Sequence, residues 1–590
     1  MHRFVSLLAL STTLLAACGD NGVNDDQALD SVATDAAQVE ASSLAAPSEQ
    51  WVVVTANPLA TSAGAAILRE GGTAIDAAIA VQAMLGLVEP QSSGLGGGAF
   101  LLYYDAQADK LQAYDGREVA PLSARPDMFL TEDGERLNFY DAVTSGLSVG
   151  VPGVVAMLDL VHREHGKLEW SSLFADAEEK ARDGFEVSPR LHSLLGRTTR
   201  LIDTPAAAAL YYTEEGEPVA EGTLLQNPAY AETLSAIAGS GAGAFYTGDI
   251  AEQIVAAVNE KAGEGTMTTE DLAAYEVQIR EPVCAEIFSA EICTMPPPSS
   301  GLTMLQILAL SEAAGLPESP SASIWPTYAE ASRLAYADRG LYIGDPSAMG
   351  TDTIGTAGLV EGLLSAPYID HRAGLIGAMA AESVEAGDPT TDGLADQLGQ
   401  DSSADLPGTS HFSIRDRYGN IASMTTTVET AFGSHLMAGG FILNNQLTDF
   451  SFSPTDEDGN PVVNAVAAGK RPRSSMSPTV VFDETGAPRI AIGSPGGPAI
   501  IGYVAKSLML HLAYDMPLQA SVEAANVVVP GSSVFVEDSL DEAAVAALDS
   551  YGLEVIEREL TSGLYGFALG RDGIEVAVDP RREGTAEVSN

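Results

Sequence analysis

The chain has 590 residues, 46% of them hydrophobic, so it is long enough for a large buried core. Its 81 acidic residues outnumber 29 basic ones and give a formal net charge of −52. Nucleic acids and anionic membrane surfaces repel such a chain, which excludes nucleic-acid binding and indicates a solvated acidic surface.

The first residues have the pattern of a secretion signal. Arg3 precedes an apolar run, residues 4–17, which is too short to span a bilayer well. The run ends in Leu-Ala-Ala before Cys18, which looks like the cleavage box of bacterial lipoproteins. We therefore expect a lipoprotein signal peptide over residues 1–17 and a lipid on Cys18. An ordinary signal peptide that is cut after Ala17 is the alternative.

Residues 18–49 are rich in Asp, Asn, Ser and Ala and show no periodicity, so we expect a flexible acidic tether. No later segment has the length or continuous apolarity of a membrane helix. The protein is thus expected in the periplasm or cell envelope, where the lipid would anchor it to the outer membrane.

Ordered structure is expected from residue 50 onward. Helices are predicted over residues 58–69 and 74–87, with Thr73 as the N-cap of the second. A strand is predicted over residues 101–104. Further helices are predicted over residues 153–165, 170–183, 228–238 and 302–314.

Two cysteines remain in the mature chain, and they lie on neighbouring apolar stretches. Cys284 lies within residues 283–288 and Cys293 within residues 291–295, and Ser289-Ala290 joins the two stretches. This pattern predicts a hairpin whose cysteines face each other, and an oxidising compartment favours a disulfide. Two buried free thiols are the alternative, and neither case indicates catalysis.

The character of the chain changes abruptly at residue 409. Residues 373–408 contain no Lys or Arg, and we interpret them as an exposed, mobile segment. Strands are then predicted in two pairs, over residues 409–416 with 421–428 and over residues 479–482 with 489–492. A mobile acidic stretch that ends at a β-core is typical of a processing boundary.

The boundary itself offers a nucleophile. A hydroxyl group needs a base, and a threonine at a new chain terminus supplies one in its own α-amine, with a pKa of roughly 7.7–8.0. Gly408 before Thr409 would let the backbone adopt the strained shape that self-cleavage needs. Taken alone, however, Gly-Thr-Ser is no evidence for such a nucleophile, and the ordinary start of a strand is the better interpretation.

Motifs on both sides of this boundary carry a family resemblance. They follow the family's order and together cover about residues 51–585. They are residues 115–118, 296–301, 337–339, 344–346, 444–446, 470–478, 493–497 and 579–581, with Asp449. On these residues the chain resembles the γ-glutamyltransferase family of N-terminal-nucleophile hydrolases. The resemblance implies an α/β (α+β) fold, a four-layer αββα sandwich, cleaved into a large subunit (50–408) and a small catalytic subunit (409–590).

The resemblance also implies the role of each site residue. Thr409 would be the nucleophile, Thr427 its hydrogen-bonded neighbour, and Gly496 and Gly497 the oxyanion hole. The α-carboxylate of the substrate would be held by Arg117, Ser474 and Ser475, and its α-ammonium by Glu429, Gln446 and Asp449. No cofactor and no metal are implied, and the eight histidines show no metal-binding spacing.

Three further features required interpretation. Lys470, Arg471 and Arg473 crowd together, which favours a positive patch for an anionic substrate such as glutathione; charges that meet nearby carboxylates are the alternative. Residues 94–99 have the spacing of a dinucleotide motif in the wrong context, so we interpret them as a packing element. His411 is interpreted as structural, although it lies beside the nucleophile.

The sequence also departs from the family pattern. Ser410 and Glu429 replace residues that are common elsewhere in the family, and the segment between Asp449 and Lys470 is short and lacks the expected tyrosine. A weaker lid would admit water more readily, so the balance of transfer and hydrolysis stays open.

The expected reaction is transfer of the γ-glutamyl group of glutathione to water or to an amine through a Thr409 acyl-enzyme. The expected partners are this small-molecule substrate and the two fragments of the chain itself, with membrane contact through the lipid alone. A glutaryl or cephalosporin-type acylase on the same scaffold and a non-catalytic binding lipoprotein are the alternatives.

Overall fold

The computed structural model describes residues 49–350, 355–390, 393–401, 408–531, 533–571 and 573–589. The expected signal peptide, the lipidation site Cys18 and the expected tether up to residue 48 lie outside these residues. Within the described part of the chain, no helix is both long enough and apolar enough to cross a membrane.

A seven-stranded antiparallel sheet carries the expected nucleophile on a central strand. Its order is β20-β1-β9-β10-β2-β3-β6. The strands are β1 (Val52–Thr55), β2 (Gly98–Asp105), β3 (Lys110–Gly116), β6 (Gln278–Arg280), β9 (Thr409–Arg415), β10 (Ile421–Thr427) and β20 (Thr585–Val588). Every residue of β9 and β10 is buried, because both faces of this sheet are covered.

A six-stranded antiparallel sheet packs against the first one. Its order is β19-β18-β14-β13-β8-β7, and β14 and β18 lie against β9. The strands are β7 (Val283–Ile287), β8 (Ala290–Thr294), β13 (Thr479–Phe482), β14 (Pro488–Gly493), β18 (Tyr565–Gly570) and β19 (Gly573–Val578). The two strand pairs predicted after residue 409 are therefore both present.

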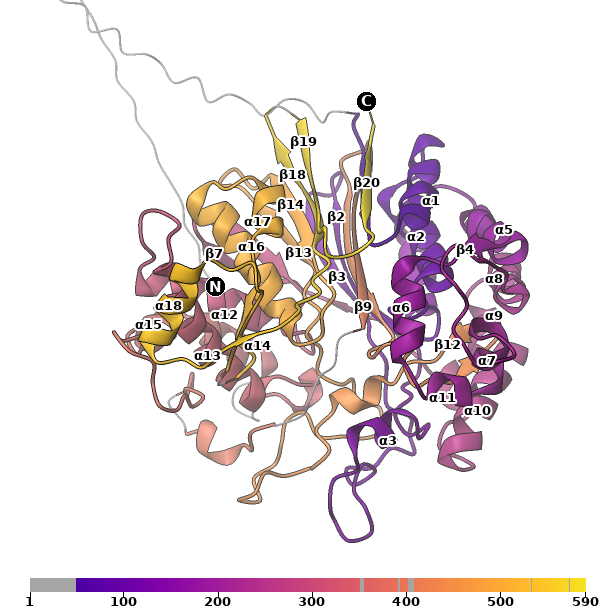
Figure 1. Ribbon diagram of the computed structural model, residues 1–590, viewed down its shortest axis with the longest axis horizontal. Helices are drawn as coiled ribbons and strands as arrows, with labels where there is room; N and C mark the ends of the chain where they lie inside the picture. The colour runs from indigo at the N-terminus through magenta and orange to yellow at the C-terminus, as the bar shows by residue number, and fades with distance from the viewer. Residues whose placement is uncertain are drawn as a thin grey trace, which may run out of the picture. The chain divides into compact units, whose positions relative to one another are not determined.

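Helices cover the outer faces of both sheets (Figure 1). On the first sheet lie α1 (Pro58–Arg69) and α2 (Ala74–Val88), and Thr73 caps α2 in a capping box with Asp76, as predicted. On the second sheet lie α12 (Gly301–Ala314) and α16 (Ala499–Tyr514), with α13 (Ile324–Tyr342) packed on α12. The four-layer αββα sandwich is confirmed.

The other helices of eight or more residues in the described part are α4 (Val154–His165), α5 (Ala175–Asp183), α6 (Pro189–Arg197), α8 (Pro228–Ser240), α10 (Asp249–Ala262), α14 (Thr356–Leu364), α15 (Ala366–Ala373) and α18 (Glu542–Tyr551). The helix predicted over residues 170–183 is divided. Its first part is a 3₁₀ helix, Trp170–Phe174, in which the Trp170 indole donates a hydrogen bond to the Ile237 carbonyl oxygen and packs on Phe174.

Each sheet contains strands from both sides of residue 408. In the first sheet β9 lies between β1 and β10, and β10 pairs with β2; in the second sheet β13 pairs with β8. Residues 46–590 accordingly form one compact unit. The expected subunits 50–408 and 409–590 are therefore not separate folding domains.

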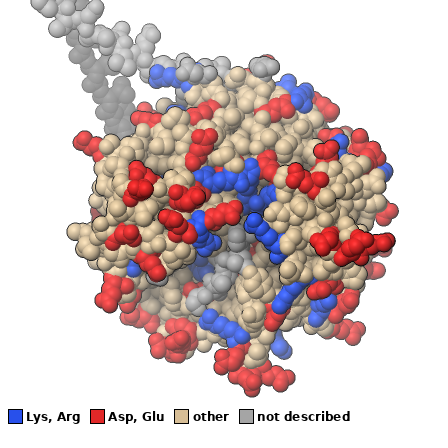
Figure 2. Space-filling view, in the orientation of Figure 1, with Lys and Arg blue, Asp and Glu red and all other residues tan. Residues whose placement is uncertain are grey.

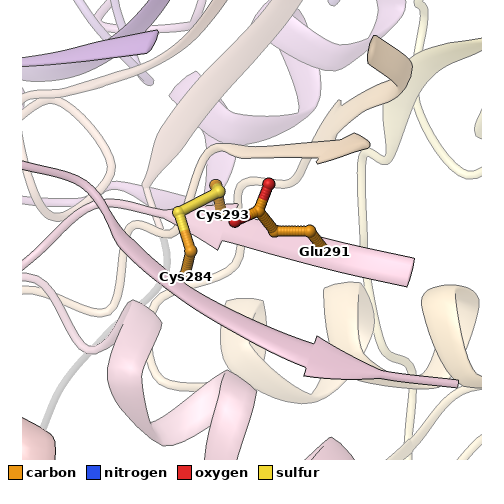
Figure 3. A group of neighbouring side chains, drawn as sticks. All are labelled: Cys284, Glu291 and Cys293. Atoms are coloured by element: carbon orange, nitrogen blue, oxygen red, sulfur yellow. A yellow bond between two sulfur atoms is a disulfide. The ribbon is translucent and has the colours of Figure 1, made fainter. Parts of the chain in front are cut away.

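The β7–β8 hairpin holds the two cysteines (Figure 3). Cys284 and Cys293 are directly opposite each other, with Cα atoms 4.1 Å apart, and form a disulfide. The turn lies at Phe288 and Ser289, one residue earlier than expected, and both residues have the positive φ that a tight hairpin turn requires. Glu291 lies beside the disulfide, but bonded sulfur atoms offer no thiolate to a metal ion.

Candidate active site

The geometry at the start of β9 centres on the hydroxyl of Thr427. Thr409 is the first residue of β9, and its register partner is Thr427, the last residue of β10. The Thr409 hydroxyl donates to Thr427 Oγ1 at 3.2 Å, and the Thr427 hydroxyl donates to the Gly408 carbonyl oxygen at 2.7 Å. The backbone N–H of Glu429 donates to Thr427 Oγ1 at 2.8 Å. The carbonyl before Thr409 thus already accepts a hydrogen bond from the residue expected to assist the nucleophile.

Two glycines allow the backbone to pack closely around this pair. A Cβ atom at Gly408 would lie 2.4 Å from the Glu429 carbonyl oxygen, and one at Gly97 would lie 2.0 Å from the Thr427 carbonyl oxygen. Gly408 does not have a positive φ, so its role is close approach and not the backbone freedom we expected. The Gly97 contact supports the interpretation of residues 94–99 as a packing element.

Gly496 and Gly497 form a turn between β14 and the N-terminus of α16. Their φ angles of +139° and +57° lie in the region that favours glycine, and a Cβ atom at Gly496 would lie 2.6 Å from the Tyr503 ring. A helix N-terminus presents backbone N–H groups and a positive dipole end. This combination suits the stabilisation of a developing oxyanion.

One cavity brings the expected site residues together. It is lined by nine of the ten, namely Arg117, Thr409, Thr427, Glu429, Gln446, Asp449, Ser474, Ser475 and Gly497. Gly496 is the neighbour of Gly497 in the turn described above. These residues come from both sides of residue 408 and span most of the chain, so the fold brings nine of the ten expected site residues to one cavity.

Arg117 is completely buried and is held on one side of its guanidinium group. Nη2 donates to Asp449 Oδ2 at 2.5 Å and to the Arg473 carbonyl oxygen at 2.7 Å, and Nε donates to the Pro472 carbonyl oxygen. Among the described residues, Nη1 has no hydrogen-bond partner. Burial raises the pKa of Glu118, whose Oε2 lies 3.6 Å from Nη1, to about 8, so this carboxyl is mainly protonated at neutral pH. Arg117 is thus paired with Asp449 through Nη2, and its Nη1 remains able to donate to an anionic ligand.

The acidic side of the cavity comes from the loop after β10 and from the short helix η5 (Gln446–Asp449). Gln446 Nε2 donates to Asp449 Oδ2 at 2.7 Å, and Asn445 Nδ2 donates to the Glu429 carboxylate. Glu429 has a φ of +82°, a strained conformation that surrounding structure must hold in place. A buried guanidinium, two carboxylates and two hydroxyls together complement a zwitterionic amino acid.

Two motifs to which we had assigned no role support the serines. Residues 298–300 bind the backbone of Ser474, because its N–H donates to the Pro298 carbonyl oxygen and its carbonyl oxygen accepts from Ser300 N–H. Arg339 Nη2 donates to Ser475 Oγ at 2.8 Å. Both supporting segments belong to family motifs, residues 296–301 and 337–339, so the sequence did mark them even though it did not indicate this role.

The cluster of Lys470, Arg471 and Arg473 is not a free positive patch, so that expectation is wrong. Lys470 Nζ donates to two backbone carbonyl oxygens, and Arg471 and Arg473 are buried beside the carboxylates of Asp115 and Asp401. Arg473 alone of the three lines the cavity. On the face drawn in Figure 2, basic side chains gather near the centre with acidic side chains among them, and further acidic side chains are scattered over the rest of the face.

The side chains next to the nucleophile on β9 are structural. His411 lies between the sheets, where its ring nitrogens meet the hydroxyls of Thr425 and Ser413, and burial lowers its pKa to about 3. Ser410 points the other way and donates to Glu89. Arg582 was missed by sequence reasoning; it is buried and donates to the Thr409 carbonyl oxygen at 3.0 Å.

The segment after Asp449 is folded against its surroundings. Isolated bridges join Ser451 to Ala465 and Thr455 to Pro461, and the ring of Phe452 stacks on that of Phe129. The described residues of the expected mobile segment, 373–390 and 393–401, are mainly exposed up to residue 383. They are fixed further on, where Gly387 binds Asp338 and Gly399 bridges Val462.

Comparison with known proteins agrees with this geometry. The family model described as gamma-glutamyltranspeptidase matches residues 60–589. The glutathione hydrolase proenzyme of Bacillus subtilis (strain 168) is 36% identical over 513 residues, which cover 85% of this chain and 84% of that protein.

Two solved structures resemble the fold. The cephalosporin acylase from Bacillus halodurans superposes with a TM-score of 0.79 at 25% identity, covering 92% of this chain and 96% of that one. The γ-glutamyltranspeptidase of Helicobacter pylori gives 0.51 at 32% identity, covering 57% of this chain and 94% of that one. With a family model matching nearly all of the folded residues, this chain is an enzyme of the gamma-glutamyltranspeptidase family.

Proposed function

We propose that this protein is a γ-glutamyltransferase with glutathione hydrolase activity, which cleaves itself before Thr409 and then uses Thr409 as its nucleophile. The observation that carries the proposal is the hydrogen-bonded series from Thr409 through Thr427 to the Gly408 carbonyl oxygen, at one end of a cavity that complements a free amino acid.

Self-cleavage would follow from this geometry in two steps. Thr409 Oγ attacks the Gly408 carbonyl carbon, the C–N bond breaks, and the hydroxyl proton ends on the Thr409 nitrogen. The Thr427 hydroxyl stabilises the negative charge that develops on the Gly408 oxygen. Water then hydrolyses the ester, which releases the Gly408 carboxylate and leaves Thr409 with a free hydroxyl and a free α-amine.

Catalysis would repeat this chemistry on a γ-glutamyl amide. The α-amine of Thr409 takes the hydroxyl proton, Oγ attacks the γ-carbonyl carbon, and the N–H groups at Gly496 and Gly497 receive the oxyanion. The C–N bond breaks, and the leaving amine takes the proton from the α-ammonium of Thr409. Water or the amine of an amino acid or peptide then attacks the ester and completes hydrolysis or transfer.

The α-amino acid end of the substrate would be held away from the reacting bond. Arg117 Nη1 and the hydroxyls of Ser474 and Ser475 face its carboxylate, and Glu429 and Asp449 face its ammonium group. The two carboxylates favour this substrate over a glutaryl chain, which lacks the ammonium group. That distinction matters because one structural relative is named a cephalosporin acylase.

The two fragments are proposed to stay together as a heterodimer, since β9 and β10 lie within a sheet that residues 52–116 also build. We also propose export through the signal peptide at residues 1–17 and lipid attachment at Cys18, which would place the enzyme in the periplasm or cell envelope on the outer membrane. The support for export is the sequence pattern alone.

The decisive experiment is to determine the mass and N-terminal sequence of the smaller fragment of the purified protein. The expected result is a fragment that begins at Thr409, together with release of p-nitroaniline from L-γ-glutamyl-p-nitroanilide. Thr409→Ala is expected to give one uncut band and no activity. A correctly folded protein that hydrolyses the anilide without exposing a threonine terminus would refute the mechanism.

A further inference from the structure

One buried carboxylate outside the expected site is connected to both sides of the cavity, the side proposed for the substrate ammonium group and the side proposed for its carboxylate. Asp401 belongs to the segment upstream of the cleavage site, and its side chain is fully buried. Asp401 Oδ2 lies 2.8 Å from Arg473 Nη2 and accepts a hydrogen bond from Asn464 Nδ2 at 2.9 Å. Its backbone N–H donates to the Gly340 carbonyl oxygen at the end of α13, which fixes the residue on the second sheet's helical layer.

Asn464 transmits this contact to the ammonium side of the cavity. Its Nδ2 also donates to the backbone carbonyl oxygen of Asp449 at 2.7 Å, and its Oδ1 accepts from the Arg473 N–H at 3.0 Å. Asn464 therefore binds the backbone of both residues, and its own side-chain position depends on the Asp401 carboxylate. No site role follows from the sequence motifs for either Asp401 or Asn464.

The carboxylate side of the cavity depends on the same contact. Arg473 pairs with Asp401 through its side chain, and its backbone carbonyl oxygen accepts from Arg117 Nη2 at 2.7 Å. The next residue along the chain is Ser474, which lines the cavity. Asp401 thus supports both ends of the loop formed by residues 449–473. Asp449 is at one end, and Arg473 at the other end precedes Ser474.

We propose that Asp401 is a positioning residue. It belongs to the large fragment, and by binding Asn464 and Arg473 of the small fragment it fixes the loop that would hold the α-amino acid end of the substrate. The inference rests on the proposed function, because it assigns Asp449 to the substrate ammonium group. The reason is geometric: a loop that binds through side chains is precise only when a supporting layer locks its backbone. A buried carboxylate with two partners supplies that support strongly, since the loss of one partner of a buried ion pair leaves an uncompensated charge.

The test measures binding and catalysis separately on the matured enzyme. Asp401→Asn is compared with wild type by calorimetry with L-glutamate and with glutarate, which lacks the ammonium group. We expect Kd for L-glutamate to rise about tenfold. Kd for glutarate should rise by less, because only the carboxylate side of the cavity contributes to its binding. In kinetics with L-γ-glutamyl-p-nitroanilide, KM is expected to rise by a similar factor while kcat changes little.

Asp388→Asn is the matched control. Asp388 lies in the same upstream segment and accepts hydrogen bonds from Thr390 N–H and Oγ1. Its replacement should leave both dissociation constants unchanged. Asn464→Ala is the second variant. It leaves the Asp401–Arg473 ion pair in place but removes the side-chain hydrogen bonds to the Asp449 carbonyl oxygen and to the Arg473 N–H. It should reproduce the larger loss of affinity for L-glutamate even if Asp401→Asn fails to fold.

The outcomes separate the inference from the proposed function. The positioning role is wrong if wild type binds L-glutamate and both variants bind it as tightly as wild type does. It is also wrong if the variants lose as much affinity for glutarate as for L-glutamate. If wild type neither binds L-glutamate nor hydrolyses the anilide, the proposed function fails, and the inference fails with it.

Discussion

The two halves of the active site are built in different ways. The catalytic half is compact in sequence and rigid in structure: Thr409 and Thr427 are register partners on adjacent buried strands, and Gly496–Gly497 lie at a helix N-terminus. The substrate half consists of loops. Arg117, Asp449 and Ser474 are held there by contacts that join both fragments, and Glu429 is held by Thr427 and Asn445.

The difference shows where each property of the enzyme is encoded. Reaction chemistry depends on backbone positions that hydrogen bonds between strands fix directly. In the proposed function, recognition of the amino acid would depend on buried charges behind the loops, including Asp401 and Arg339. Changes in the catalytic half should therefore alter kcat, and changes in the loops should alter KM. Three variants test this division, and a fourth tests a buried side chain next to the catalytic half.

Replacing Gly496 with alanine should give the largest effect. The new Cβ would collide with Tyr503 and is strained at a φ of +139°, so the turn that presents the oxyanion donors must shift. We expect kcat to fall by about 10²–10³ with a smaller change in KM, measured with the γ-glutamyl anilide. Gly486→Ala is the control, since it has a φ of +80° in an open hairpin turn and should leave kcat unchanged. Equal losses in both variants would point to general strain.

Replacing Arg117 with lysine tests the loop half. Lysine keeps the positive charge but cannot reproduce the planar set of donors that binds Asp449, the Arg473 carbonyl oxygen and a ligand together. We expect KM to rise about a hundredfold, which is about 2.7 kcal/mol, with a smaller effect on kcat. Cleavage before Thr409 should proceed normally on a denaturing gel. A fall in kcat with unchanged KM would contradict the division.

Replacing Thr427 with valine tests whether the hydroxyl of this residue assists self-cleavage. The variant loses the hydroxyl that binds the Gly408 carbonyl oxygen, and loss of this hydrogen bond should slow self-cleavage about tenfold. The rate is measured from the appearance of the small fragment over time. Thr427→Ser retains the hydroxyl and should cleave at close to the wild-type rate; if it is as slow as valine, the hydroxyl is not the cause.

Replacing His411 with glutamine should change stability and leave the chemistry intact. The pKa of this buried ring falls to about 3 on folding, from an ordinary value of about 6.5. Between these values the unfolded chain binds more protons, so the stabilising contribution is complete above pH 6.5 and declines as the pH falls. Thermal unfolding should therefore be less pH-dependent between pH 6.5 and 4 in the variant than in wild type. An altered acidic limb of the kcat profile would show that His411 takes part in catalysis.

Sequence patterns predicted the elements well where local signals were strong. The capping box at Thr73 and the strand pair after Thr409 are examples, because the cap and the turn residues lie within a few positions of the elements that they delimit. The residues assigned to the site by resemblance meet at one cavity for a related reason: each belongs to a motif that could be matched position by position.

What the sequence could not predict depends on long-range partners. The basic residues at 470–473 looked like a free patch because Asp115 and Asp401 lie far away in the chain. Arg582 is 173 positions from Thr409, whose carbonyl oxygen it binds. The reason for a glycine at position 408 could not be predicted either, because the Glu429 carbonyl oxygen approaches it only after the strands have paired.

Both sheets are shared by strands from the two sides of residue 408, and this has a thermodynamic consequence. Before cleavage, unfolding and refolding involve one molecule. After the Gly408–Thr409 bond is broken, complete unfolding releases two polypeptides, and the native state can return only by a second-order encounter. The melting temperature of the mature enzyme should therefore fall on dilution, whereas that of the Thr409→Ala precursor should not.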